Sequence, residues 1–317
     1  MTTRRGLAIG CGGILGFAWT AVALDAVEQA LGWDVRTADV LIGTSAGAEI
    51  VAALGSGRTP GDLLAALDGA PGADPVLADH VAVDPGMTPP VPALGLPGLG
   101  LVGAGMRSGS VYTALAGLLP KGRGDADWLR AFGRALTPRG GWVDHPATWL
   151  VAADPRTGER VAFGSPSAPT VDLGTAIAAS WAIPGWFPPV PVRGRAFVDG
   201  GAVSSVSADL LAPLDLDEVV VVAPMTTEGG ASATGLSRLE RLLRAQMTRG
   251  LDREVALLRA AGTRVIRVEP GPAELAAMGP NFMDSARRPA TLAAARRAVP
   301  ARVAEAIRTA VVEGEIV

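Results

Sequence analysis

A serine between two glycines is the strongest chemical signal in this sequence. Ser45 lies two residues from Gly43 and from Gly47, after an apolar run that ends at Ile42 and before a helical pattern that runs to Leu54. Glycines at these two positions allow the sharp strand-to-helix turn that presents a nucleophilic hydroxyl to a substrate. The flanking patterns supply the strand and the helix that such a turn requires. We therefore predict that Ser45 is a nucleophile.

A second signal is a glycine-rich loop in the first strand-to-helix connection. Its glycines are Gly10, Gly12, Gly13 and Gly16. Such a loop gathers backbone N–H groups in one concavity, and the helix that follows adds partial positive charge, so it suits a phosphate or a developing oxyanion. A dinucleotide site needs a third glycine where Leu15 stands and an acidic residue after the second strand, so the pattern argues against a nucleotide. A plain tight connection is the alternative.

A third signal is an aspartate at the end of a predicted strand. Asp199 follows the apolar run 196–198 and precedes Gly200 and Gly201. A tight turn of this kind holds the carboxylate in place, where it can face a serine from another loop. An ordinary turn that closes a strand is the alternative, and it is the commoner fate of Asp-Gly.

The histidines limit the kinds of serine hydrolase that the chain can be. His80 and His145 are the only two, and both precede Asp199, so the chain order serine, acid, histidine is impossible. We interpret His145 as a surface or strand-start residue, and His80 as part of an irregular stretch without a partner. A serine nucleophile then needs another base, and a carboxylate is the natural substitute.

Together these motifs resemble the patatin-like phospholipases. The glycine loop, G-x-S-x-G and a later D-G-G occur in the family's order, and residues 179–190 match its Ala-Ser-x-Ala-x-Pro-x-x-Phe-Pro-Pro-Val segment. Residues 152–159 resemble the hairpin before that segment, and the resemblance extends to about residue 225. It implies a three-layer α/β/α sandwich with a central, mostly parallel sheet. It also implies a Ser-Asp dyad with Ser45 as nucleophile and Asp199 as base.

The implied activity is hydrolysis of lipid acyl esters, as in a phospholipase or lysophospholipase. We assign the oxyanion hole to the backbone N–H groups of Gly12, Gly13 and Ala46, and we expect no cofactor and no metal. An acyltransferase or a thioesterase that uses the same acyl-serine remains open. So does a catalytically silent lipid-binding relative, because Leu15 stands where the family usually has a basic residue.

Composition indicates an ordinary folded enzyme. The chain has 317 residues, of which 49% are hydrophobic and 19% charged, with a net charge of −3. These values fit a sizeable core and argue against a nucleic-acid partner. Cys11 is the only cysteine, which excludes an internal disulfide, and we interpret it as a small apolar filler. The sequence leaves the oligomeric state open.

The N-terminus looks like a secretory signal, because Arg4 and Arg5 precede an apolar run. Cleavage near Ala23 would discard the first strand and the glycine loop. We therefore expect these residues to be structural and the protein to be cytoplasmic. We also expect no membrane-spanning helix, although transient contact with a membrane surface stays open.

Strand and helix patterns alternate along one domain that covers residues 1–317. We predict strands at 7–9, 40–43, 148–152, 161–163, 196–198, 218–223 and 265–268, and long helices at 17–31, 237–261 and 290–308. An irregular apolar insertion is expected at about 70–125. Its uncharged part, 85–106, fits a lid, a lipid contact, a wall of the acyl pocket or a buried linker.

Two groups of residues have both a structural and a functional interpretation. Trp181, Trp186 and Phe187 either wall the acyl pocket or, more commonly for such spacing, belong to the core. The arginines of the predicted helix 237–261 indicate a solvated face. Among them, Arg238, Arg241 and Arg244 are alternatively placed to meet anionic lipid.

Overall fold

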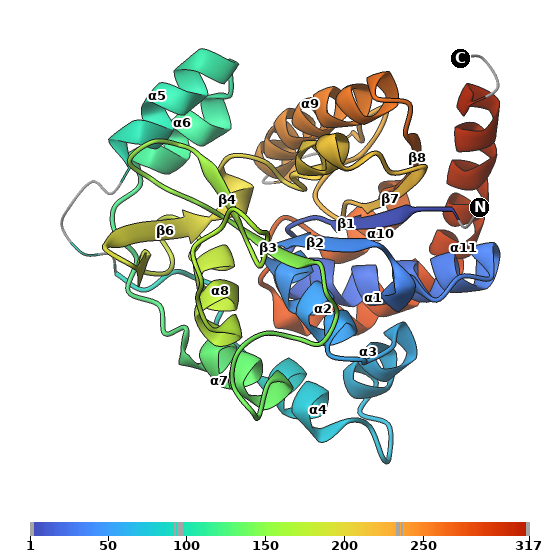
Figure 1. Ribbon diagram of the computed structural model, residues 1–317, viewed down its shortest axis with the longest axis horizontal. Coiled ribbons are helices and arrows are strands. Elements are labelled where there is room, and N and C mark those ends of the chain that lie inside the picture. Colours follow the sequence, from blue (N-terminus) through green and yellow to red (C-terminus); the bar gives the residue numbers. More distant parts are fainter. Residues whose placement is uncertain (1–2, 92, 94–97, 233–234, 236, 315–317) are drawn as a thin grey trace.

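A mostly parallel sheet forms the middle layer of the molecule (Figure 1). The computed structural model describes residues 3–314, apart from 92, 94–97, 233–234 and 236. The strands are β1 (Arg5–Ile9), β2 (Val40–Thr44), β3 (Thr148–Ala153), β4 (Arg160–Phe163), β5 (Val190–Val192), β6 (Arg195–Asp199), β7 (Glu218–Val222) and β8 (Arg264–Val268). Their order in the sheet is β5-β6-β3-β2-β1-β7-β8, and β4 pairs with β3.

The central strands are parallel and one end of the sheet is antiparallel. β3, β2, β1, β7 and β8 run in the same direction, whereas β4 and β6 oppose β3 and β5 opposes β6. All seven predicted strands are present. The sequence analysis missed β5, a three-residue strand in which a proline stands between two valines.

Helices cover both faces of the sheet. They are α1 (Gly13–Leu31), α2 (Ala46–Gly55), α3 (Pro60–Leu67), α4 (Pro75–Ala82), α5 (Leu99–Ser108), α6 (Val111–Leu118), α7 (Asp127–Leu136), α8 (Leu173–Ser180), α9 (Ser237–Ala260), α10 (Pro272–Met278) and α11 (Arg288–Gly314). Side chains alternate along β1, where Leu7 and Ile9 join a core with α1, α2 and α11, and Ala8 joins a core with α9. This arrangement confirms the predicted three-layer α/β/α fold.

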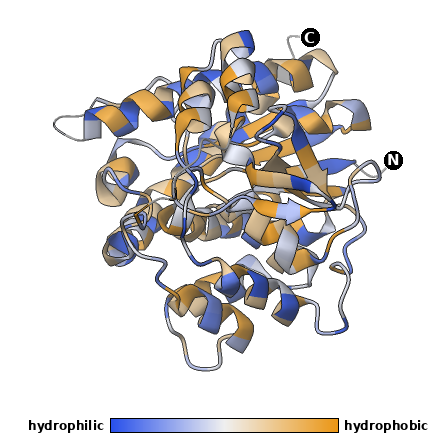
Figure 2. Ribbon diagram, turned by 90° about the vertical axis from the view of Figure 1, so that its left-hand side faces the viewer, coloured by the Kyte–Doolittle hydropathy of each residue, from blue (hydrophilic) through white to orange (hydrophobic). Residues whose placement is uncertain are grey.

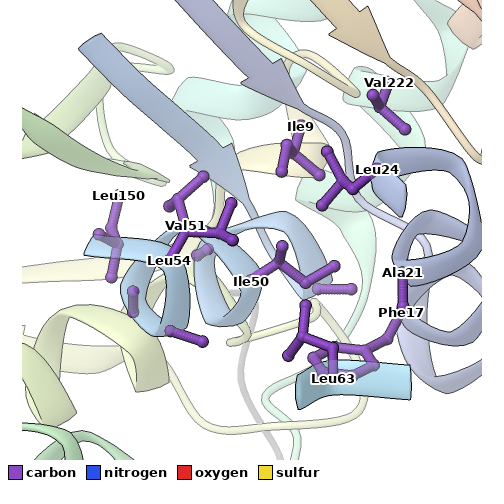
Figure 3. Packing of buried hydrophobic residues seen from close by; sticks show 14 of the residues in the cluster. Ile9, Phe17, Ala21, Leu24, Ile50, Val51, Leu54, Leu63, Leu150 and Val222 are labelled. Carbon is purple, nitrogen blue, oxygen red and sulfur yellow. The ribbon is translucent and has the colours of Figure 1, made fainter. Parts of the chain in front are cut away.

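The helix that follows Ser45 is held deep in the larger core. Every residue of α2 is buried, and Ile50 and Leu54 contribute to the cluster that also contains Phe17 and Leu24 of α1 (Figure 3). Full burial of one such aliphatic side chain contributes roughly 1.5–3 kcal/mol. The dense packing fixes the start of α2, and with it the position of Ser45.

The first helix differs from our expectation that no helix has the length and composition to span a membrane. α1 is long and apolar enough to cross a membrane, judged by length and composition alone. In the fold, however, 72% of its most apolar window is buried inside the protein, as expected for a core helix. Its apolar character therefore serves the packing between the sheet and α11, the helix with which it has its most extensive contact.

The segment 70–125 is not irregular throughout. It contains α4, α5 and α6, and the last two form a hairpin at one end of the molecule (Figure 1). Glycine at position 100 allows α5 to pack closely, because a Cβ there would lie 1.9 Å from the Arg156 carbonyl oxygen. Gly100 thus permits close helix packing inside a segment that we expected to be irregular. In Figure 2, which views the molecule from that end, the outer helices carry hydrophilic and hydrophobic residues.

Candidate active site

Ser45 stands on a strained turn between β2 and α2. Its φ of 56° is unusual for a residue with a side chain. A Cβ on Gly43 would lie 2.2 Å from the Gly47 carbonyl oxygen, and one on Gly47 would lie 2.2 Å from the Ile9 carbonyl oxygen. Both glycines are therefore required by close backbone approach. The turn has the geometry of a nucleophile elbow.

Asp199 lies at the end of β6, opposite Ala152 of β3. One carboxylate oxygen accepts the Gly201 N–H at 2.7 Å, which fixes the side chain. Burial raises the pKa of Asp199 to about 7, although the hydrogen bond from the Ser45 hydroxyl and that from Gly201 oppose the rise. The structure thus brings Ser45 and Asp199, which are far apart in the sequence, to the same cavity, where their side chains interact.

Both side chains face one small cavity of about 40 Å³. Ser45 is 2% exposed and Asp199 is 4% exposed, so bulk water hardly reaches either. Most of the wall is apolar. It is formed by Cys11, Gly12, Gly13, Tyr112, Ile183, Pro184, Gly201, Ala202, Met225, Leu243, Met247 and Phe282.

Unpaired amides surround the same cavity. In the described part of the chain, no acceptor takes the N–H groups of Gly12, Gly13 and Ala46. The first amides of a helix have no partner within it, and here α1 and α2 both begin beside Ser45. The partial positive charge of two helix N-termini therefore converges beside Ser45.

A segment that sequence reasoning used only for its resemblance holds the two side chains together. The Ser45 N–H donates to the Ser180 hydroxyl at 2.8 Å, and that hydroxyl donates to the Val151 carbonyl at 2.6 Å. Two residues later, the Ala182 carbonyl accepts the Asp199 N–H at 2.9 Å. Residues 180–182 thus connect the turn of the serine to the turn of the aspartate.

Comparison with known proteins supports the same family. Residues 106–212 match the family model for patatin-like phospholipases. This middle part of the chain is similar to patatin-like phospholipases. This match contains Ser180 and Asp199, whereas Ser45 and the glycine loop lie outside it. Among solved structures, the chain is similar to VipD from Legionella pneumophila, with 12% sequence identity and a TM-score of 0.43 over 97% of this chain and 67% of that one. No curated protein sequence matches the chain.

The glycine loop is fixed by backbone hydrogen bonds. The Gly10 N–H donates to the Val222 carbonyl and the Cys11 N–H donates to the Ser205 carbonyl, at 2.9 and 2.8 Å. Leu15, at the position where the family usually has a basic residue, is fully buried in the core. The unpaired amides therefore keep their positions without a cation at that position.

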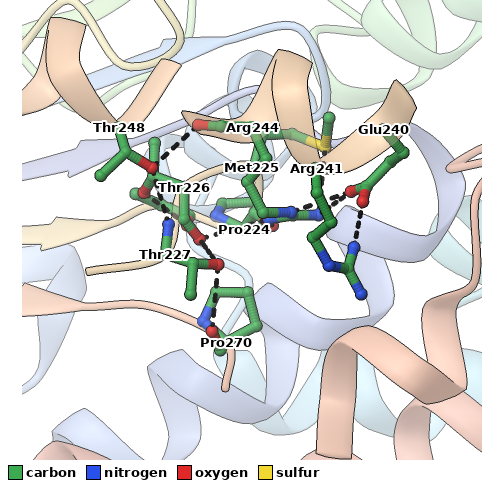
Figure 4. A network of polar contacts seen from close by, with 10 residues as sticks. Pro224, Met225, Thr226, Thr227, Glu240, Arg241, Arg244, Thr248 and Pro270 are labelled. Carbon is green, nitrogen blue, oxygen red and sulfur yellow. Dashed lines mark hydrogen bonds and ion pairs between the residues drawn. The ribbon is translucent and has the colours of Figure 1, made fainter. Parts of the chain in front are cut away.

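Arg244 holds the segment that contains Pro224 and Thr226, which packs against the glycine loop (Figure 4). Its guanidinium donates to the carbonyls of Pro224 and Thr226 and pairs with Glu240. The Pro224 ring packs against Gly12, where a Cβ would meet it at 2.8 Å. Arg244 is 3% exposed, so the interpretation that it meets lipid is wrong.

A buried acid-histidine pair lies behind the nucleophile helix. Glu49, one turn after Ser45, contacts His80 Nε2 at 3.0 Å, and the His80 ring stacks on Phe132. His80 belongs to α4, so the prediction that it lies in an irregular stretch is wrong, and its partner Glu49 is one that the sequence did not indicate. Burial raises the pKa of Glu49, and the negative charge of Glu49 contributes to the raised pKa of Asp199. No periodicity in the sequence links these two elements.

The other candidate residues contribute to the hydrogen bonds and packing of the fold. His145 bonds to Thr148 and to the Ala38 carbonyl, at the start of β3. Burial raises the pKa of the Cys11 thiol above its usual range, which agrees with a filler and not with a nucleophile. Trp181 is buried against Trp128, in the core. Within the described residues, no group of histidine, cysteine and acidic side chains has the arrangement of a metal site.

A larger polar cavity of about 300 Å³ adjoins the first one. The two share Tyr112, Gly201 and Met247. Its other walls include Ser204, Arg160 and hydrophilic residues of α9. The cavity that holds Ser45 therefore adjoins a larger one that is lined by several polar side chains.

Proposed function

We propose that this protein is a serine acyl-ester hydrolase of lipids, of the phospholipase or lysophospholipase kind. The observation that carries this proposal is the contact between Ser45 and Asp199 in an apolar cavity that is bordered by unpaired amides. The patatin-like segment at 106–212 supports a lipid acyl hydrolase. We further propose that the protein acts in the cytoplasm and needs no cofactor.

In the first half of the reaction, the Ser45 oxygen attacks the ester carbonyl carbon while its proton passes to Asp199. The carbonyl oxygen becomes an oxyanion, which accepts hydrogen bonds from the N–H groups of Gly12, Gly13 and Ala46. One such donor contributes roughly 3 kcal/mol to transition-state stabilisation. Collapse of the intermediate breaks the ester bond, and the leaving alcohol takes the proton from Asp199.

In the second half, water attacks the acyl-serine and gives a proton to Asp199. The second oxyanion uses the same amides. Its collapse releases the fatty acid and returns the proton to Ser45. A pKa of about 7 suits Asp199 to both directions of transfer near neutral pH.

The neighbouring cavities suggest how an ester lies in the site. The apolar cavity beside Ser45 suits the first part of an acyl chain. The polar cavity with Ser204 and Arg160 suits the alcohol part, such as a glycerophosphate head group. This division favours an ester with an apolar acid and a polar alcohol.

A serine-directed fluorophosphonate probe tests whether the site is catalytic. Labelling of Ser45 is expected in the wild-type protein and not in Ser45→Ala. A folded wild-type protein that is not labelled would support the silent lipid-binding alternative. Labelling combined with transfer of the acyl group to an added alcohol or thiol, in preference to water, would instead support an acyltransferase.

An ester panel of graded chain length then tests the reaction and the dyad. Ser45→Ala and Asp199→Asn should each abolish hydrolysis while far-ultraviolet circular dichroism stays unchanged. Asp68→Asn is the control, because Asp68 is a surface carboxylate that pairs with Arg296 and lines neither cavity. Full activity of either dyad variant would end the model.

A further inference from the structure

The cavity around the dyad is closed by two surface helices. Its outer wall contains Tyr112 of α6 together with Leu243 and Met247 of α9. The two helices are joined by a hydrogen bond of 3.0 Å from the Tyr112 N–H to the Gln246 side chain. A volume of about 40 Å³ is far below the roughly 300–1,000 Å³ of ordinary ligand sites. A lipid chain therefore needs more room than this cavity offers, and separation of the two helices would provide it.

The outward side of the hairpin formed by α5 and α6 is apolar. Val111, Leu115 and Leu118 follow one another at helical spacing on the exposed face of α6, and Leu115 is 56% exposed. A surface helix normally presents polar residues to water. We define the docking face as Leu99, Met106, Val111, Leu115, Leu118 and Leu119, all large and exposed.

α9 repeats this arrangement where it meets the hairpin. Leu239 and Leu242 are exposed, and Leu243, the next residue, lines the cavity. Large apolar side chains thus lie on the outside of both helices that close the site. Several large exposed apolar side chains on neighbouring helices indicate an interaction site rather than ordinary surface.

The charge around the docking face identifies its partner. Residues 85–124 contain Arg107, Lys121 and Arg123 and no acidic residue, in a chain whose net charge is −3. All three cations are exposed. Exposed leucines beside cations, with acids only at the borders of the segment (Asp84 and Asp125), fit the interface of an anionic lipid surface, where each cation contributes about 1 kcal/mol to binding.

We propose that the α5–α6 hairpin and the first turns of α9 dock on a membrane that contains anionic lipid, with the cover of the active site against the bilayer. Docking supplies new apolar contacts to the outer sides of α6 and α9, which favours their separation and admits an acyl chain. The proposed docking does not depend on hydrolase activity, whereas its effect on substrate entry rests on the proposed function.

Vesicle flotation with the Ser45→Ala protein tests the docking without hydrolysis. The protein should bind vesicles of phosphatidylcholine and phosphatidylglycerol more tightly than vesicles of phosphatidylcholine alone. The double variant Leu115→Ser, Leu118→Ser should weaken this binding by about ten-fold or more. Val311→Ser, Val312→Ser removes two exposed valines from α11, and this matched control should bind as the parent does.

A charge variant tests the second part of the argument. Lys121→Glu, Arg123→Glu should weaken binding to the anionic vesicles by about ten-fold at low salt and leave binding to phosphatidylcholine unchanged. Equal binding by all variants, or equal affinity for the two vesicle types, would overturn the proposal. So would a change of oligomeric state in the leucine variant with unchanged vesicle binding, because the face would then be a protein interface.

Substrate entry is measured as the rate of hydrolysis of vesicle lipid divided by that of a soluble short-chain ester. These assays use protein that retains Ser45. The leucine variant should lower hydrolysis of vesicle lipid, relative to a soluble short-chain ester, by about ten-fold. An unchanged ratio would contradict the coupling of docking to entry. Absence of hydrolysis of both substrates by the wild type would contradict the proposed function and leave the flotation result intact.

Discussion

The Ser180 hydroxyl holds the nucleophile turn, because it accepts the Ser45 N–H at 2.8 Å and donates to β3 at 2.6 Å. Ser180 is fully buried and far from the solvent. Its loss would leave the Ser45 N–H and the Val151 carbonyl without partners, and an unsatisfied buried group costs about 1–3 kcal/mol. The hydroxyl therefore positions Ser45 without touching the substrate.

Ser180→Ala is expected to lower kcat for a soluble ester by about 10- to 100-fold, because small displacements of a reacting group have effects of this size. KM should change little. Thr175→Ala, at an exposed hydroxyl on the same helix, is the control and should keep the wild-type rate. Wild-type kcat in Ser180→Ala would show that the turn is held without this hydrogen bond.

The pH dependence follows from Asp199, which must be ionised to accept a proton. Its pKa of about 7 places the acid limb of kcat/KM near neutrality. Below that pH, kcat/KM should fall by about ten-fold per pH unit, and above it the rate should reach a plateau. The measurement is a profile from pH 5 to 9 with a soluble ester. A limb near pH 4 would mean that Asp199 is not the base.

Asp199 should also reduce the stability of the fold at neutral pH. Its pKa rises from about 3.9 in the unfolded chain to about 7 in the native state. Between these values the native state binds more protons than the unfolded state, so the free energy of unfolding falls as the pH rises.

Asp199→Asn lacks this penalty and keeps the acceptor for the Gly201 N–H. Relative to wild type, its free energy of unfolding should be unchanged near pH 4 and higher by about 2–4 kcal/mol at pH 8. Urea denaturation at several pH values measures the difference. A variant that is less stable than wild type at pH 8 would show that ionisation of the buried Asp199 does not destabilise the fold.

Much of this site is predictable from sequence because its parts are local. Ser45 needs glycines two residues away on both sides, and Asp199 needs a strand before it and a tight turn after it. These constraints appear in the sequence as glycines at fixed distances from Ser45 and from Asp199. The seven strands were also predictable, because each is an apolar run bounded by turn residues.

What sequence could not show depends on contacts between distant elements. Arg244 lies in a helix rich in arginine and acid, which indicates a solvated surface, but its side chain is buried against Pro224. His80 and Glu49 meet only because α4 packs behind α2. The helices of 85–124 were missed because glycine and proline lower helix propensity, whereas packing of α5 against α6 overrides it.

The buried charge of Arg244 predicts an asymmetry between single and double variants. Arg244→Met leaves Glu240 buried beside Arg241 alone and frees the Pro224 carbonyl, so it should destabilise the fold by about 3–5 kcal/mol. Removal of both charges in Arg244→Met, Glu240→Gln should recover part of this loss. Thermal denaturation measures the stabilities, and equal values for the single and the double variant would contradict the pairing.

Glu49 offers a test of the electrostatics behind the dyad. Its negative charge contributes to the raised pKa of Asp199, although burial is the larger cause. Glu49→Gln removes the charge, keeps the volume and retains an oxygen that can accept from His80. The acid limb of kcat/KM should therefore move to lower pH by a fraction of a unit, with little change in the plateau.

The control for this shift is Glu274→Gln, which removes another buried carboxylate that pairs with Arg302 and lies in neither cavity. Its acid limb should coincide with that of the wild type. If Glu49→Gln leaves the limb in place while the protein stays folded, Glu49 is neutral in the native state. The pKa of Asp199 would then be set by burial and by its hydrogen bonds from Ser45 and Gly201 alone.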